Sequence, residues 1–148
     1  MRKFEVIKEY LDKEIKIPER ATKNSAGYDL SSAEDVLIKP KEIVLIKTGL
    51  KVSIPEGEVL LVFPRSSLAM KRGLMMSNGV GVVDSDYYNN PNNEGHLMIP
   101  LYNFTDQEVL VKKGERVSQG IFVKYGITID DEVSNNNHRT GGFGSSGK

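Results

Sequence analysis

Apolar and polar residues alternate with a period of two along most of this 148-residue chain. Such a period places successive side chains on opposite faces of an extended chain, and therefore predicts half-buried β-strands. The clearest alternating segments, separated by Gly, Pro or Asn, are residues 35–38, 42–46, 59–63, 96–102 and 109–111. Short strands at close spacing are typical of an all-β sandwich or barrel, so this is the fold class that we expect.

One short helix is expected, at residues 68–72. Ser66 or Ser67 can cap its first turn, and Gly73 can end it in the left-handed conformation. Prolines argue against any long helix in the interior, because they recur at Pro40, Pro55, Pro64, Pro91 and Pro100. Free N–H groups at the helix start, beside Arg65, are a candidate phosphate site, although a serine-rich cap next to an arginine is also common in proteins without one.

Length and charge restrict the class of protein. A chain of this length fits one domain with a real core. Twenty basic and twenty acidic residues cancel, so the chain lacks the basic field of a general nucleic-acid binder, and we expect no nucleic-acid partner. The absence of cysteine excludes disulfides and thiolate chemistry. The first residues hold no long apolar run, so we expect neither a signal peptide nor a membrane span, and a cytoplasmic location.

The segment 77–88, SNGVGVVDSDYY, brings two carboxylates and two aromatic rings together behind a glycine-spaced apolar run. Valines favour a strand, whereas Gly79 and Gly81 weaken one and mark places where another molecule can approach the backbone closely. In an extended chain Asp84 and Asp86 would point to the same face. Two interpretations are open: a hairpin that ends in a polar turn, or a base-binding hairpin that carries a catalytic carboxylate.

Composition changes at residue 134, where the chain becomes rich in Ser, Asn and Gly. We therefore divide the chain into a β domain, 1–133, and a flexible arm, 134–148. Such ends are usually frayed. However, Arg139 and Phe143 stand among glycines and serines, where guanidinium, hydroxyl and N–H groups could bind phosphates and a phenyl ring could stack on a base.

Five motifs resemble those of the trimeric dUTPase family, in the family's order. They are AGYDL (26–30), PRSSLA (64–69), NGVGVVDSDY (78–87), GERVSQ (114–119) and GGFGSSG (141–147). Each motif is short, but five in order are specific. The resemblance implies a distorted jelly-roll-like β fold and a homotrimer with shared active sites. It also implies Mg²⁺-dependent hydrolysis of dUTP to dUMP and pyrophosphate, which limits uracil in DNA and supplies dUMP for dTMP synthesis.

The resemblance also implies roles for individual residues. Asp84 is the general base, and Asp29 holds Mg²⁺ through water. Asn78, Gly79 and Val83 bind the base, Phe143 covers it, and Tyr87 packs on the deoxyribose and leaves no room for a 2′-hydroxyl. The phosphates are bound by Arg65, Ser66, Ser67, Gln119, Arg139, Ser145 and Ser146.

Two features depart from the common family pattern. Residues Tyr88 to Asn93 lie between the tyrosine of the third motif and Gly95, where many members have almost nothing; we interpret them as a longer loop beside the site. In the tail, His138 occupies the usual arginine position and Arg139 follows it, so either could meet the γ-phosphate. His96 is expected to be a surface or satisfied polar residue.

Two other functions stay open at this point. A dCTP deaminase has a similar fold and a similar RSSLA-like segment, but uses a glutamate that the Gly-Val-Val-Asp context lacks. A phage-type regulatory protein that binds a repressor is the other, with the Asn-rich insertion as its contact surface.

Overall fold

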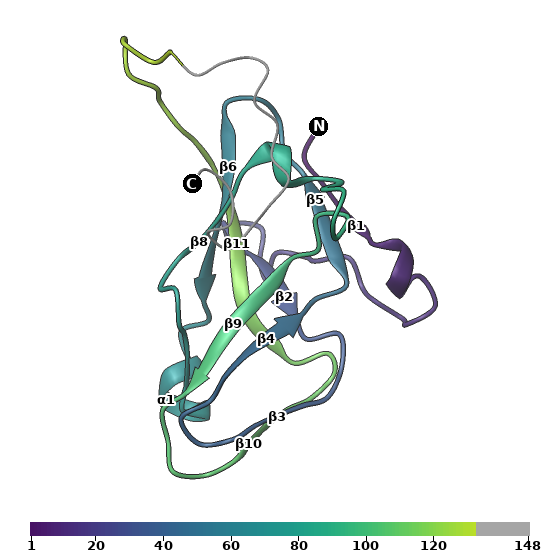
Figure 1. Ribbon diagram of the computed structural model, residues 1–148, viewed down its shortest axis with the longest axis vertical. Coiled ribbons are helices and arrows are strands. Elements are labelled where there is room, and N and C mark those ends of the chain that lie inside the picture. The colour runs from purple at the N-terminus through teal and green to yellow at the C-terminus, as the bar shows by residue number, and fades with distance from the viewer. Residues whose placement is uncertain (133–148) are drawn as a thin grey trace.

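The computed structural model describes residues 1–132 and is almost entirely β (Figure 1). Over those residues the strands are β1 Lys3–Val6, β2 Tyr28–Ser31, β3 Val36–Ile38, β4 Ile43–Lys47, β5 Leu50–Ser53, β6 Glu58–Pro64, β7 Leu74–Met76, β8 Gly81–Val83, β9 Met98–Asn103, β10 Val109–Val111 and β11 Arg116–Lys124. The helices are α1 Leu68–Arg72 and two 3₁₀ turns, η1 Lys8–Tyr10 and η2 Ser85–Tyr87. The expected all-β class with one short helix is confirmed.

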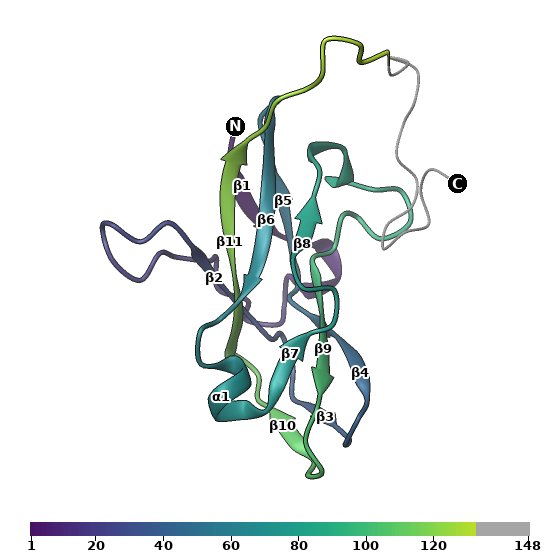
Figure 2. The same ribbon diagram turned by 90° about the vertical axis from the view of Figure 1, so that its left-hand side faces the viewer.

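The strands form two main antiparallel sheets. One has the order β2-β11-β6-β8 and the other the order β4-β9-β7, and two-stranded ribbons β1-β5 and β3-β10 complete the structure. Figure 2 shows β11 and β6 on the left and β9 and β4 on the right, so the sheets face each other across the interior. Leucines from both sheets fill that interior: Leu30, Leu60, Leu74 and Leu101 are each fully buried. The buried apolar positions of the alternating segments thus belong to one core.

Local details of α1 agree with the sequence in part. Gly73 ends the helix with φ 67°, as expected for a left-handed C-terminal residue. Ser67 occupies the N-cap position, but its side chain makes no capping hydrogen bond, so the expected serine cap is wrong in this respect. No helix within residues 1–132 is long and apolar enough to cross a membrane.

The segment 77–88 is not a hairpin. β7 before it pairs with β9, whereas β8 pairs with β6, so the chain crosses from one sheet to the other. A turn at Gly79, whose φ is +73°, makes the crossing. β7 buries Leu74 and Met76 by joining the β4-β9-β7 sheet, while β8 pairs with β6, and this tertiary pairing overrides the local hairpin signal.

The expected common face for Asp84 and Asp86 is also wrong. The chain leaves β8 at Asp84, whose backbone is extended, and turns at once into η2 at Ser85–Tyr87. Residues two apart share a face only in an extended chain, and η2 ends that geometry after Asp84. The turn instead brings Tyr87 back over the end of β8.

Candidate active site

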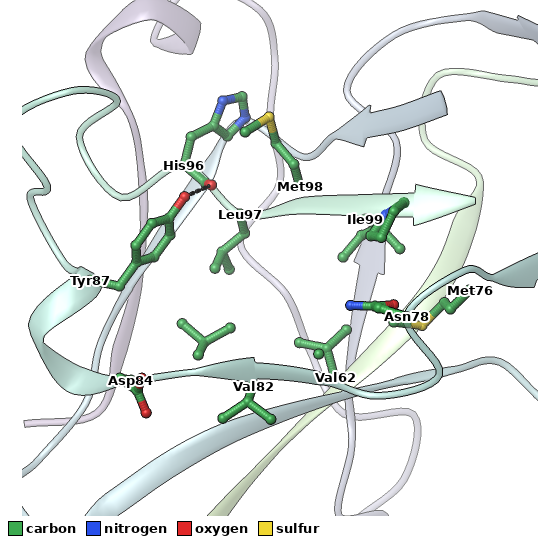
Figure 3. A pocket seen from close by; sticks show the side chains of 13 residues that line it. Val62, Met76, Asn78, Val82, Asp84, Tyr87, His96, Leu97, Met98 and Ile99 are labelled. Carbon is green, nitrogen blue, oxygen red and sulfur yellow. Dashed lines mark hydrogen bonds between the residues drawn. The ribbon is translucent and has the colours of Figure 1, made fainter. Parts of the chain in front are cut away.

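A cavity of about 230 Å³ lies between β8 and β9 (Figure 3). Its wall is mostly apolar: Val62 of β6 lies on one side and Leu97 and Ile99 on the other, and Met76 comes from β7, which pairs with β9. Asn78 lies at one end of this wall and Asp84 at the other, as Figure 3 shows. A concave, largely apolar space with a few polar groups at fixed positions is typical of a small-molecule site.

The backbone of β8 contributes polar groups to the cavity. β8 is the last strand of its sheet, so among residues 1–132 its outer edge has no strand partner. Such an edge presents N–H and C=O groups that can pair with a ligand. Gly81 lies close to β6, where an added Cβ would be 3.2 Å from the Cβ of Val62. The glycine therefore lets β8 lie close to its neighbour while its other edge faces the cavity.

Tyr87 is held by two hydrogen bonds to its hydroxyl. The hydroxyl donates to the carbonyl oxygen of His96 at 2.7 Å and accepts from Nδ2 of Asn93 at 2.9 Å. Its backbone N–H donates to the carbonyl oxygen of Asp84 at 3.1 Å, which ties the aromatic residue to the end of β8. Tyr87 is buried, and its ring forms one wall of the cavity.

His96 supports this wall from behind. Its Nε2 accepts a hydrogen bond from the backbone N–H of Gly49 at 2.9 Å, and its ring packs on Tyr10 with the ring centres 5.2 Å apart. Burial lowers the pKa of His96, and the acceptor role of Nε2 also requires the neutral ring. The expectation that His96 is a satisfied polar residue is confirmed.

A second group of candidate residues lies elsewhere on the same sheet. Asp29 on β2 is opposite Gln119 on β11, and the Gln119 side chain lies directly over Gly27, where a Cβ would collide with it. Nη1 of Arg116 is 3.5 Å from a carboxylate oxygen of Asp29. Arg65 follows the end of β6, and Ser66 and Ser67 lead from it into α1.

The Asp84 end of the cavity lies far from Arg65 along the sheet. Val83 is opposite Leu60, and Arg65, directly after the end of β6, is five residues further along the chain, about 16 Å away if the chain is extended. The structure thus brings Asn78, Val83, Asp84 and Tyr87 together around the cavity, with Gly79 in the adjoining turn. The lining of the cavity does not include the second group, which comprises Asp29, Arg65, Ser66, Ser67 and Gln119.

Four further candidates, Arg139, Phe143, Ser145 and Ser146, lie outside the described residues, as does the arm 134–148. Conversely, Leu97, Met98 and Ile99 line the cavity although the sequence did not single them out. Their only sequence signal is the apolar alternation that every strand of the core shares. It indicates a strand but not which cavity the strand lines.

Comparison with known proteins decides the family. A family model described as dUTPase matches residues 13–147. A deoxyuridine 5′-triphosphate nucleotidohydrolase of Lactococcus lactis is 52% identical over 99% of this chain and 98% of its own. The chain belongs to the dUTPase family.

Solved dUTPase structures have the same fold. The crystal structure of the dUTPase from Streptococcus mutans is 48% identical, with a TM-score of 0.82 over 85% of this chain and 98% of that one. A mutant dUTPase from phage phi11 of S. aureus is 25% identical, with a TM-score of 0.73 over 90% of this chain and 96% of that one. That phage structure is described as revealing the coordination of a structural Mg(II) ion. The family match favours the dUTPase interpretation over the dCTP deaminase one.

The residues of this dUTPase fit a magnesium ion that is held only in part by protein. No group of three or more His, Cys, Asp or Glu residues that could hold a metal occurs in the described part of the chain. Mg²⁺ seldom needs such a cage, because it keeps several waters and binds one or two carboxylates together with substrate phosphates. The half-buried carboxylate of Asp29, on the same sheet as Gln119, suits that mode of binding.

The buried His96 predicts a pH dependence of stability. In the folded chain the pKa of His96 lies below its ordinary value of 6.5. At a pH between the folded and the ordinary pKa, the unfolded state therefore binds more protons than the folded state. Its stabilising contribution is therefore complete above pH 6.5 and decreases as the pH falls below that value. We expect His96→Gln, whose amide oxygen can accept from Gly49, to lose less unfolding free energy than the wild type between about pH 8 and pH 5. Urea unfolding at fixed protein concentration measures the unfolding free energy of the two proteins at each pH. If the two free energies changed in parallel with pH, this would contradict a buried neutral histidine.

Proposed function

We propose that this chain hydrolyses dUTP to dUMP and pyrophosphate, at a site assembled from several copies of the chain. The observation that carries the proposal is the position of Asp84, at the end of an edge strand and beside a largely apolar cavity, in a chain of the dUTPase family. A flat base would lie in the cavity between β8 and β9, and the phosphates would leave it past Asp84.

Selection of the base follows from the polar groups around the cavity. The amide of Asn78 and the outer edge of β8 can pair with O4, N3–H and O2 of uracil. Cytosine would bring a donor against a donor, and a site that leaves buried polar groups unpaired rejects such a ligand by roughly ten-thousandfold. Thymine has a methyl group for which a closely approaching backbone, made possible by Gly79 and Gly81, leaves no space.

Selection of the sugar depends on Tyr87. Its ring is one wall of the cavity and both of its hydroxyl bonds run to the protein. A deoxyribose packed flat on this ring would fit, whereas a 2′-hydroxyl would meet carbon where it needs a hydrogen-bond partner. A buried hydroxyl without a partner is costly, so UTP is refused.

The chemical step needs a base for water and positive groups for the triphosphate. Water must attack the α-phosphorus in line with the departing pyrophosphate, and Asp84 accepts its proton. The α- and β-phosphates are bound by Arg65, Ser66, Ser67 and Gln119. The γ-phosphate is bound by Arg139, Ser145 and Ser146. Phe143 covers the uracil. Asp29 would hold Mg²⁺ through water, and that ion would supply positive charge to the phosphates.

The separation of the two residue groups supports shared sites in a homotrimer. Within one chain the level of Val83, beside Asp84, is about 16 Å from Arg65 along the strand direction, which favours a second copy that brings its phosphate-binding residues to the Asp84 end of this cavity. The outer face of the β4-β9-β7 sheet offers an apolar surface for assembly. Ile43, Tyr102 and Met75 lie opposite one another across its three strands, and Ile43 is 58% exposed.

Replacing Asp84 tests its role as the base. Asp84→Asn keeps the shape of the side chain but cannot accept the proton, so kcat should fall by about a thousandfold while a non-hydrolysable dUTP analogue still binds. Steady-state pyrophosphate release and calorimetric titration of the analogue measure the two quantities. Asp106→Asn, in an exposed turn far from the cavity, is the control and should keep normal turnover. Near-normal turnover in Asp84→Asn would remove Asp84 from this role.

Mixing two inactive variants tests the shared site. Asp84→Asn and Arg65→Ala are each expected to be nearly inactive, but a site that takes its base from one copy and its arginine from another is intact in some mixed trimers. Random assembly of equal amounts should restore about a quarter of wild-type activity in the unsorted mixture, and about a third in trimers freed of both homotrimers. Coexpression with two affinity tags, followed by purification on both, gives the mixed trimers. If each chain contains a whole site, the mixture will be as inactive as its parents.

A further inference from the structure

The loop between η2 and β9 is fixed to the rest of the chain rather than loosely attached. Nζ of Lys51 on β5 is 2.8 Å from a carboxylate oxygen of Glu94, and the backbone N–H of Lys8 donates to the other oxygen of Glu94 at 3.0 Å. These hydrogen bonds lower the pKa of Glu94, which keeps it ionised. The hydroxyl of Tyr88, in turn, hydrogen-bonds to Glu5 on β1. The insertion is thus tied at both ends to the β1-β5 ribbon.

The end of the insertion folds back onto Tyr87. Gly95 has φ +82°, and a Cβ at this position would lie only 2.6 Å from the carbonyl oxygen of Tyr87. The backbone N–H of Gly95 donates to Oδ1 of Asn93 at 2.9 Å. Because Oδ1 is used in this way, the amide of Asn93 presents its Nδ2 to the Tyr87 hydroxyl, at 2.9 Å.

The Tyr87 hydroxyl therefore has a defined orientation. A phenol has one proton, and here that proton is donated to the carbonyl oxygen of His96 at 2.7 Å, as Figure 3 shows. The lone pairs are left to accept from Asn93, so donor and acceptor roles are both used. Two bonds from different directions fix the tilt of the ring more closely than packing and a single bond would.

We propose that Asn93 is a positioning residue for sugar selection: through its bond to the hydroxyl it holds the Tyr87 ring where it excludes a 2′-hydroxyl. The inference rests on the proposed function, in which this ring packs on the deoxyribose. It assigns the insertion a role in the enzyme's own specificity. Asn93 touches neither the substrate nor the reacting atoms, and acts only through Tyr87.

Two substitutions remove the bond in different ways. Asn93→Ala deletes the amide. Asn93→Asp keeps the shape and the acceptor for Gly95 but cannot donate, so the phenol proton is shared between two acceptors. In both, we expect the ratio of kcat/KM for dUTP to kcat/KM for UTP to fall by about tenfold, mostly through better use of UTP. If Asn93→Ala does not fold, Asn93→Asp still supplies the test.

The background of Tyr87→Phe separates positioning from general damage. Without the hydroxyl, Asn93 cannot hydrogen-bond to the ring. Adding either Asn93 substitution to Tyr87→Phe should therefore change the dUTP/UTP ratio of kcat/KM by less than about twofold. Asn89→Gly is the matched control: it removes an amide of the same insertion that accepts from Lys51 at 2.6 Å, and it leaves the Asn93 bond intact. Glycine suits the φ of 58° at this position, and the control should keep the wild-type ratio.

Two results would overturn the proposal. One is a dUTP/UTP ratio in both Asn93 variants that stays within about twofold of the wild-type value; the other is an equal fall in the Tyr87 and Tyr87→Phe backgrounds. A wild-type chain that releases no pyrophosphate from dUTP would instead contradict the proposed function. In that case the relative affinity for dUMP and UMP, measured by calorimetry on the same variants, tests Asn93 without any turnover.

Discussion

The crossing of the chain from the β4-β9-β7 sheet to the β2-β11-β6-β8 sheet is the constraint on which the site depends. β7 and β8 are neighbours in sequence but pair with β9 and β6, which lie in different sheets. β8 is consequently an edge strand that faces β9 across a cavity, and its outer backbone edge has no strand partner among residues 1–132. A hairpin of the same sequence would have paired that edge with β7, and no base could then bind there.

The same geometry explains why one chain holds only part of the site. An antiparallel sheet is stiff along its strands, so the register that sets Val83 against Leu60 also fixes how far Val83, the neighbour of Asp84, lies from Arg65. Rotation of side chains cannot close a gap of about 16 Å along a strand. In the proposed homotrimer, closed symmetry would place one copy's phosphate-binding residues beside another copy's cavity at each of the three interfaces.

Sequence and structure agree most closely where the signal is local. The alternating segments became β3, β4, β6, β9 and β10 with small shifts of their ends, and Gly73 ends α1 as its position implied. The family motifs named Asn78, Asp84 and Tyr87, which the structure places around one cavity. The partner of β8 was not predictable, because the same alternation fits a hairpin and a crossing. Nor was the role of Asn93, whose bond to Tyr87 depends on a positive φ at Gly95 and on ties to Lys51.

The most direct test of the central claim is to incubate the wild-type chain with dUTP, dCTP and UTP separately, with Mg²⁺, in water enriched in heavy oxygen. Pyrophosphate and ammonia are assayed, and mass spectrometry determines whether dUMP or pyrophosphate contains the heavy oxygen. Our account predicts pyrophosphate from dUTP alone, no ammonia, and the heavy oxygen in dUMP, because water attacks the α-phosphorus. Ammonia from dCTP, heavy oxygen in the pyrophosphate, or no product from dUTP would contradict it.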